Sequence, residues 1–338
     1  MSRIAVVGAG SWGTALSLVL AKRGGHSITL WSHTGLVAES IRQARENSIY
    51  LPGLPVPDSV AVTTDLEEAV KNAEILLLAV PSEHLRSVCC AMAPLLTSKQ
   101  LIVNATKGIE DGTYLRMTQV MGEVLGKYNL ALPCGVLSGP SFAQEVGAGS
   151  PTAITIASSD PAIATRVQEE FSSPTLRLYT NEDVVGVELG GALKNVIAIA
   201  AGATYGLELG HNSVAALITR GIAEITRLAV ACGGRRETLA GLSGLGDLVL
   251  TCTGALSRNR HVGMELGSGR CLKEILVDMH GRVAEGVRTT DAALGVARRM
   301  GVEMPITEKV AAVLHERISA KEAMRELMSR PGRDESSR

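Results

Sequence analysis

The sequence carries almost no net charge, and this limits the partners that it can attract. Its 33 Lys and Arg residues are balanced by 34 Asp and Glu residues, which leaves a formal net charge of −1 at pH 7. Such a surface has no global field that draws in nucleic acid or an anionic membrane. Any anion that the protein binds must therefore be held by a local cluster of residues.

Cysteines are few and lack the spacing of a metal site. The chain has six of them: Cys89, Cys90, Cys134, Cys232, Cys252 and Cys271. They form no C-x-x-C pair and no metal-like pattern with histidine. We interpret them as reduced packing residues of a cytoplasmic protein, and we expect neither a disulfide framework nor a metal.

The sequence also shows no stretch that approaches the roughly 18–20 apolar residues of a membrane span. The first predicted strand begins at residue 4 and leaves no space for a targeting peptide. We therefore expect a soluble, cytoplasmic protein without membrane insertion. Its 338 residues predict two domains, since single cores usually stop growing at about 250–300 residues.

The first half of the chain alternates strands with helices. We expect strands at 4–7, 28–31, 60–63, 74–80, 100–104, 134–137, 152–157 and 175–180, and helices at 11–23, 34–45, 82–96 and 113–126. The apolar run from Ile75 to Val80 is typical of a parallel strand that is buried on both faces. This alternation predicts a doubly wound, Rossmann-type parallel sheet over residues 1–185. Pro52, Pro55 and Pro57 predict a loop.

From about residue 184 the strand signals fade and helical patterns follow. They cover 184–205, 212–232, about 260–277, 288–300, 305–317 and 320–329. The last begins with a capping box that runs from Ser319 to Glu322. We therefore expect an all-helical domain over residues 186–338. Its excess of apolar surface favours a homodimer that forms through this domain.

A glycine motif joins the first predicted strand to the first predicted helix. Gly8, Gly10 and Gly13 form the pattern G-x-G-x-x-G of dinucleotide-binding sites. Gly8 permits the tight turn, Gly10 leaves room for the pyrophosphate, and Gly13 lets the helix and the strand pack closely. The start of the helix then offers N–H groups and a partial positive charge to the phosphates.

Ligands of open α/β sheets bind beyond the carboxyl ends of the strands, which directs attention to four loops, including Pro81–His84 after the fourth strand. His33 follows the second strand, where NAD-specific sites usually place an acidic residue. The absence of a carboxylate removes repulsion against a 2′-phosphate, so we expect NADPH to be tolerated. Lys107 ends another strand and is expected to point into the cofactor cleft. The segment from Ser138 to Ser141 allows close approach of a ligand, although a plain turn explains it nearly as well.

The helical half contains a lysine in an apolar setting. From Val187 to Gly202 only Glu188 and Lys194 are charged, so this helix should be buried. A buried lysine is costly unless it is paired or neutral. Burial lowers the pKa of a lysine, which suits a group that gives and takes a proton near neutrality. The alternative is a lysine that reaches the surface with its end group.

Further polar residues follow this helix. Asp247, on a glycine-rich loop from Gly241, could offset the charge of Lys194. The run from Ser257 to Arg260 combines a serine, arginines and an amide, which together could clamp an oxyanion, because arginine presents planar, bidentate donors. We interpret these residues together as a substrate pocket.

These motifs resemble the bacterial NAD(P)-dependent glycerol-3-phosphate dehydrogenase family nearly from end to end. The matching segments are GAGSWGTAL (8–16), NATKGIE (104–110), SGPSFAQE (138–145), LGGALKNVIAIAAG (189–202), GLGDLVLTCTGALSRNR (244–260) and VAEGVRT (283–289). The resemblance implies reversible reduction of dihydroxyacetone phosphate by NADPH or NADH to sn-glycerol 3-phosphate, the backbone of phospholipids.

The resemblance also implies roles for individual residues. Lys194 would exchange the proton, supported by Asp247, with Asn195 and Thr251 nearby. The remaining roles fall into three sets: substrate contacts from Lys107, Gly139 and Ser141; phosphate contacts from Ser257, Arg258 and Asn259; and cofactor contacts from Ser11, Trp12, His33, Lys107, Ala143, Arg258, Val283 and Glu285.

Two other functions are compatible with such a two-domain chain. One is a hydroxyacid dehydrogenase, although those enzymes carry a K-x-x-N pattern and here Lys194 and Asn195 are adjacent. The other is a nucleotide-sensing module without turnover, which would need no buried acid–base group.

Overall fold

The computed structural model describes residues 2–279, 284–332 and 334–335. By its internal contacts the chain divides into two compact units. The first comprises Met1–Lys107 and Leu115–Val184, and the second comprises Gly108–Tyr114 and Val185–Arg338. The short segment Gly108–Tyr114 lies within the range predicted for the first domain, but it packs with the helical part of the chain.

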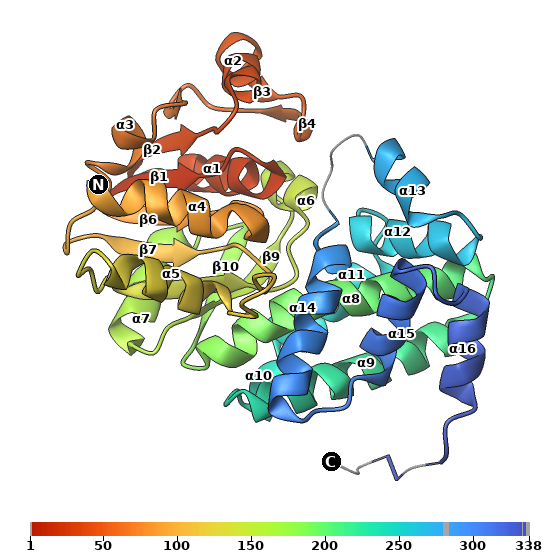
Figure 1. The fold of residues 1–338 in the computed structure, drawn as a ribbon. Helices are drawn as coiled ribbons and strands as arrows, with labels where there is room; N and C mark the ends of the chain where they lie inside the picture. The colour runs from red at the N-terminus through yellow and green to blue at the C-terminus, as the bar shows by residue number, and fades with distance from the viewer. Residues whose placement is uncertain (1, 280–283, 333, 336–338) are drawn as a thin grey trace. The chain divides into compact units, whose positions relative to one another are not determined.

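An eight-stranded sheet forms the centre of the first unit (Figure 1). Its strands are β1 (Ser2–Val7), β2 (His26–Trp31), β5 (Val60–Thr63), β6 (Ile75–Leu78), β7 (Leu101–Asn104), β8 (Cys134–Ser138), β9 (Thr152–Ala157) and β10 (Leu176–Asn181). The strand order is β10-β9-β8-β7-β6-β1-β2-β5. From β1 the chain adds β2 and β5 on one side, and it then returns to add β6 and the later strands on the other side of β1. This order confirms the predicted doubly wound, Rossmann-type fold.

One pairing departs from the predicted parallel arrangement. β9 runs antiparallel to β8, while β10 is again parallel to β9. The short helix that joins β8 to β9, α6 (Ala143–Ala148), does not carry the chain back to the other end of the sheet. A parallel strand needs such a crossover, whereas an antiparallel one does not. The sheet is therefore mostly parallel.

Helices cover both faces of this sheet. They are α1 (Ser11–Arg23), α2 (Gly35–Ala44), α3 (Leu66–Val70), α4 (Ser82–Met92), α5 (Met117–Gly126), α6 and α7 (Pro161–Phe171), with a single 3₁₀ turn at Ala93–Leu95. Alternate residues of β1 enter different cores: Ile4 and Val6 pack with α1, whereas Ala5 and Val7 pack with α4 and α5. Burial on both faces explains the continuous apolar character of the central strands.

The segment rich in proline is not wholly a loop, as the sequence reading predicted. Leu51–Pro55 forms β4, which pairs antiparallel with the two-residue strand β3 (Glu46–Asn47). A proline cannot donate a hydrogen bond to a neighbouring strand, and it is tolerated here because β4 has only this one short partner. The hairpin is held to the main sheet's helices by Leu51, which is 2% exposed.

The second unit is helical. Its helices are α8 (Val184–Gly206), α9 (His211–Ala231), α10 (Arg236–Leu239), α11 (Asp247–Thr253), α12 (Arg258–Gly267), α13 (Leu272–Asp278), α14 (Glu285–Met300), α15 (Pro305–Leu314) and α16 (Ala320–Met328). As predicted, Ser319 caps α16, with its Oγ accepting a hydrogen bond from the N–H of Glu322. The predicted helix over 260–277 is in fact two, broken where Gly269 has a φ of +96°.

The central helix α8 is more apolar than the sequence reading allowed. By length and composition it could cross a membrane, and so could the bent pair formed by 236–253 and 258–267. However, 83% of the apolar window of α8 is buried within the protein. A helix that is apolar all round is also typical of the core of a folded unit, and α8 has that position here.

Close contact between α8 and α12 depends on glycines. A Cβ atom added to Gly202 would lie 2.0 Å from the carbonyl oxygen of Arg260, and one added to Gly263 would lie 2.0 Å from that of Ile199. One turn further along, the Cβ positions of Gly206 and Gly267 likewise lie within 2.5 Å of carbonyl oxygens of the facing helix. The two helices therefore touch at their backbones, with no room for side chains between them.

A charged side chain holds a second helix junction together. The carboxylate of Glu224, on α9, is 1% exposed and accepts hydrogen bonds from the N–H groups of Ile306 and Thr307, each at 2.9 Å, and from the Thr307 hydroxyl. These N–H groups belong to the first turn of α15, which has no carbonyl partners for them. Burial, opposed by these hydrogen bonds, raises the pKa of Glu224 above its usual value.

Substitution of Gly202 by alanine is expected to destabilise the protein. The new methyl group would force α8 and α12 apart, and overpacking of this kind costs about 1–3 kcal/mol. Gly202→Ala should therefore lower the free energy of unfolding in urea by about 2 kcal/mol. Gly122→Ala in α5 is the matched control, because no atom lies within 4 Å of its Cβ position; it should be neutral or stabilising. Equal effects of the two changes would contradict this account.

The raised pKa of Glu224 predicts a pH-dependent contribution to stability. The folded protein holds the carboxyl proton over a pH range in which the unfolded chain, with a pKa near 4.5, has lost it. The contribution is therefore complete below about pH 4.5 and is lost as the pH rises through the folded pKa. The free energy of unfolding of the wild type, minus that of Glu224→Gln, should fall as the pH rises above about 4.5. A constant or rising difference would contradict the assignment.

Candidate functional site

The three glycines of the motif have the three distinct geometries that the sequence predicted. Gly8 has a φ of +119°, and its Cβ position lies 2.6 Å from the carbonyl oxygen of Ala79 at the end of β6. The Cβ position of Gly13 lies 1.9 Å from the carbonyl oxygen of Gly8. Gly10 alone faces open space, with no atom within 4 Å of its Cβ position. The turn is therefore closed on its inner side and accessible at Gly10.

The first turn of α1 can accept an anion. Gly10 is its N-cap residue, and no side chain caps the helix there. The first N–H groups of a helix have no partners within it and carry a partial positive charge. Ser11 and Trp12 follow in this turn, and the indole Nε1 of Trp12 is buried without a hydrogen-bond partner. Donors without acceptors fit a bound pyrophosphate, and they lie at the point where the strand order changes direction.

His33 lies just beyond the carboxyl end of β2, where its side chain is exposed. Its ring is 5.9 Å from that of Trp31, centroid to centroid. The next residue, Thr34, is the N-cap of α2 and makes no side-chain cap hydrogen bond. The residues that follow β2 directly are Ser32, His33 and Thr34, so none of these three carries a carboxylate.

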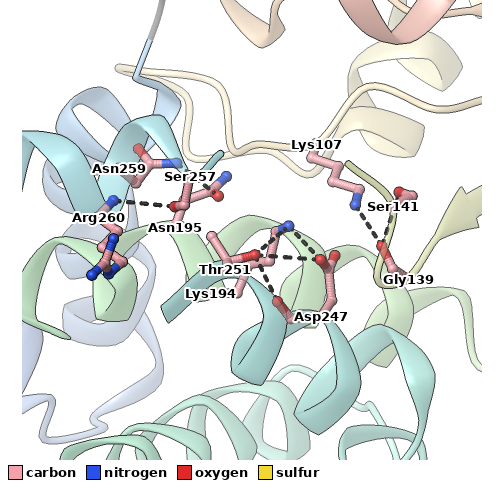
Figure 2. Close-up of polar contacts among 10 residues, drawn as sticks. All are labelled: Lys107, Gly139, Ser141, Lys194, Asn195, Asp247, Thr251, Ser257, Asn259 and Arg260. Atoms are coloured by element: carbon pink, nitrogen blue, oxygen red, sulfur yellow. Dashed lines mark hydrogen bonds and ion pairs between the residues drawn. The ribbon is translucent and has the colours of Figure 1, made fainter. Parts of the chain in front are cut away.

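Lys107, Gly139 and Ser141 come together at the ends of β7 and β8. The Nζ of Lys107 donates a hydrogen bond to the carbonyl oxygen of Gly139 at 3.1 Å, and the Ser141 hydroxyl donates to the same oxygen at 3.1 Å (Figure 2). Gly139 has a φ of +140°, and its Cβ position would lie 2.9 Å from the Cα of Ile154. Only glycine fits there, so the turn places an ammonium and a hydroxyl on one carbonyl.

In the second unit, Lys194 forms a buried ion pair. Its Nζ lies 2.5 Å from Oδ1 of Asp247 and donates a hydrogen bond to the Thr251 hydroxyl at 2.9 Å (Figure 2). The Thr251 hydroxyl in turn donates to the backbone carbonyl oxygen of Asp247 at 2.6 Å. Asp247 is completely buried and Lys194 is 8% exposed, so the ammonium does not extend into solvent. This arrangement can hold, give and take a proton at the Nζ atom.

Asp247 reaches Lys194 because of an unusual helical turn. The glycine-rich segment that the sequence predicted as a loop is a π-helical turn, Leu242–Gly246, which continues into α11 at Asp247. The Cβ position of Gly190 in α8 lies 2.5 Å from the carbonyl oxygen of Ser243, so glycine lets this turn lie directly against α8. Such turns are often found at functional sites.

Beside the ion pair, two amides link three helices. Nδ2 of Asn259 in α12 donates to Oδ1 of Asn195 in α8 at 2.9 Å, and Oδ1 of Asn259 accepts from the N–H of Gly286 in α14 at 2.9 Å. The side chain of Asn259 is thus engaged within the protein. Ser257 caps α12 by accepting from the N–H of Arg260, while Arg258 is exposed. Of the predicted clamp, Arg258 is the residue that points to solvent.

The remaining predicted contacts are more scattered. Ala143 is the first residue of α6 and is half-buried, and Glu285 is the first residue of α14. Val283 lies outside the described residues.

Cys252, next to Thr251, is completely buried, and burial raises the pKa of its thiol to about 12. It therefore remains a protonated packing residue, consistent with the sequence reading.

One polar residue that contacts the dinucleotide loop is not predicted by the sequence. Asn47 in β3 is 0% exposed and donates from Nδ2 to the carbonyl oxygen of Ala9 at 2.9 Å. No local pattern points to this residue, because prolines just beyond it predicted a loop and its partner is 38 positions away.

Comparison with known proteins gives the family. Two models match this chain, described as the N-terminus (residues 3–164) and the C-terminus (residues 183–325) of NAD-dependent glycerol-3-phosphate dehydrogenase. A protein of Acidobacterium capsulatum named glycerol-3-phosphate dehydrogenase (NAD(P)+) is 63% identical, with 99% of this chain and 100% of the relative covered. One of the same name from Koribacter versatilis is 59% identical, with 99% of each covered.

A solved structure agrees with these matches. In the crystal structure of glycerol-3-phosphate dehydrogenase from Coxiella burnetii, the chain is 41% identical in sequence to this one. The two folds superpose with a TM-score of 0.92, with 97% of this chain and 99% of that one covered. Sequence and fold therefore agree over nearly the whole length. The chain belongs to the NAD-dependent glycerol-3-phosphate dehydrogenase family.

Proposed function

We propose that the protein interconverts dihydroxyacetone phosphate and sn-glycerol 3-phosphate with NADPH or NADH. The observation that carries this proposal is the buried group of Lys194, Asp247 and Thr251 in a chain that also has an open dinucleotide loop. Full-length relatives named glycerol-3-phosphate dehydrogenase (NAD(P)+) support the substrate and the cofactor.

Lys194 is the residue that exchanges the proton. In the direction of reduction its ammonium gives a proton to the carbonyl oxygen of the ketone, and in the direction of oxidation its amine accepts one from the hydroxyl. The Asp247 carboxylate stabilises the ammonium in a site from which water is largely excluded, where a charge is otherwise costly. Thr251 accepts a hydrogen bond from the same Nζ atom and thereby orients it.

The cofactor site is supported by the glycine loop of the first unit. A bound nicotinamide dinucleotide supplies or takes up the hydride. Gly8, Gly10 and Gly13 shape the turn, and the first turn of α1, with Ser11 and Trp12, offers donors to the phosphates. His33 leaves room for a 2′-phosphate.

Other site residues remain predictions from the family resemblance. Arg258, which is exposed, would bind the phosphate of the substrate by bidentate hydrogen bonds. Lys107, Gly139 and Ser141 would contact the substrate, with Ser257, Asn259 and Asn195 supporting it. Ala143, Val283 and Glu285 would contact the cofactor. We also infer a homodimer in the cytoplasm that supplies glycerol 3-phosphate for phospholipid synthesis, with residues 1–185 binding the nucleotide and 186–338 the substrate.

Replacement of Lys194 tests the proposed chemistry. The wild type should oxidise NADPH with dihydroxyacetone phosphate and not with a small keto acid such as pyruvate. Lys194→Met should lower kcat by at least about a hundredfold, because the proton donor is lost. The Kd of NADPH should change by less than about threefold. Turnover close to that of the wild type would exclude Lys194 as the proton donor.

The double variant Lys194→Met, Asp247→Asn separates chemistry from folding. Lys194→Met alone removes the ammonium that pairs with the buried carboxylate of Asp247, and breaking such a pair costs about 3–5 kcal/mol of stability. Removing the charge of Asp247 as well should recover most of the Tm but none of the turnover. Recovery of both would mean that the lysine serves stability alone.

His33 is expected to determine tolerance of the 2′-phosphate. His33→Asp adds a carboxylate at an exposed strand end, where it repels a phosphate and can bond ribose hydroxyls. The ratio of kcat/KM for NADPH to that for NADH should fall at least tenfold, which corresponds to about 1.4 kcal/mol, because two like charges about 4 Å apart near a protein surface repel each other by ~1–4 kcal/mol. His33→Asn is the neutral control and should keep the wild-type ratio. An unchanged ratio in the aspartate variant would place the 2′-phosphate elsewhere.

A further inference from the structure

Asn47 is the most completely engaged amide near the dinucleotide loop. Its Nδ2 donates to the carbonyl oxygen of Ala9 at 2.9 Å and to the Thr14 hydroxyl at 2.8 Å, and its Oδ1 accepts from the N–H of Tyr50 at 3.1 Å. A carbonyl oxygen can only accept and a backbone N–H can only donate, so these partners determine which end of the amide is nitrogen. The side chain has one arrangement that satisfies all three.

The partners of Asn47 belong to the two parts of the glycine motif. Ala9 lies between Gly8 and Gly10, and Thr14 lies in the first turn of α1. All are buried: Ala9 is 6% exposed, and Thr14 and Asn47 are 0% exposed. One side chain from the β3–β4 hairpin (Figure 1) therefore holds both the turn and the helix start.

The bond to Ala9 determines the direction of the next N–H group. The peptide between Ala9 and Gly10 is trans, so its C=O and N–H point to opposite sides. Because Asn47 holds the carbonyl of Ala9 inward, the N–H of Gly10 points away from the hairpin. The residue that carries it has open space at its Cβ position, whereas Gly8 and Gly13 are closed in by backbone atoms.

We propose that Asn47 is a positioning residue for the pyrophosphate of the bound dinucleotide. It holds the Ala9–Gly10 peptide so that the Gly10 N–H is presented to a phosphate oxygen and cannot rotate inward. This inference rests on the proposed function, because it requires that the loop binds a dinucleotide. Asn47 acts through Ala9 and is not itself a ligand of the phosphate. Preorganised donors of this kind bind an anion without a reorganisation cost at the moment of binding.

The first unit offers a matched control in Gln100. This amide is 4% exposed, donates from Nε2 to the carbonyl oxygens of Val70 and Ala73, and accepts from the N–H of Thr97. It thus makes the same set of hydrogen bonds as Asn47, with two acceptors and one backbone N–H, and none of its partners belongs to the glycine motif. Loss of either amide should cost a similar amount of stability.

The test compares Asn47→Ala with Gln100→Ala by fluorescence titration with NADPH, alongside Tm and steady-state kinetics. Both changes should lower the Tm. Only Asn47→Ala should raise the Kd and KM of NADPH, by about tenfold or more, with kcat at saturating NADPH and the KM of dihydroxyacetone phosphate unchanged. A rise in the NADPH Kd no larger than that of Gln100→Ala would overturn the inference.

A second variant covers the case in which Asn47→Ala does not fold. Asn47→Asp keeps the side-chain volume and the oxygen that accepts from the N–H of Tyr50, but it replaces the NH2 group that donates to the carbonyl oxygen of Ala9. It should raise the NADPH Kd as well, whereas Thr14→Val, which leaves the Ala9 bond in place, should raise it by less than about threefold. Wild-type affinity in Asn47→Asp would overturn the inference. Failure of the wild type to bind either NADPH or NADH would overturn the proposed function and this inference together, whereas normal binding by the Asn47 variants overturns only the inference.

Discussion

The ion pair between Lys194 and Asp247 is the interaction around which the helical unit is arranged. Both charges are buried, where each alone would be costly. Pairing requires that α11 begins within hydrogen-bond distance of the middle of α8. The π-helical turn at Leu242–Gly246 and the missing side chain of Gly190 allow this approach. The geometry of this ion pair thus depends on backbone contact between helices.

The same use of glycine recurs on other sides of α8. Gly202 and Gly263 let α12 lie against it, and Gly286 lets the first turn of α14 lie against the carbonyl oxygen of Asn195, 2.6 Å from its Cβ position. A central helix without bulky neighbours at these points can be surrounded closely by several others. Asn259 then connects α8, α12 and α14 through hydrogen bonds. Small residues and these amide hydrogen bonds together fix the helices around Lys194.

The sequence predicted much of the fold because its strongest signals are local. The apolar strand before Gly8, the helix after Gly13 and the apolar length of α8 are each visible within about twenty residues. The doubly wound fold and the family resemblance followed from them and are confirmed. Short elements such as α3 and the β3–β4 hairpin were missed, because four or five residues carry too little periodicity and the prolines of β4 argued for a loop. The antiparallel direction of β9 was also missed, since a run such as Thr152–Ala157 looks the same in either direction.

What the sequence by itself determined is which residue types are available: a glycine turn after a strand, a lysine in an apolar helix, and an aspartate near a second glycine segment. Tertiary structure decided which of them meet. Lys194 and Asp247 are 53 positions apart, and Asn47 and Ala9 are 38 apart. No periodicity connects such pairs, because a side-chain hydrogen bond depends on distances of tenths of an ångström between elements whose packing is set by the whole core. The chemistry could be anticipated from composition and motif, whereas its geometry arose only from folding.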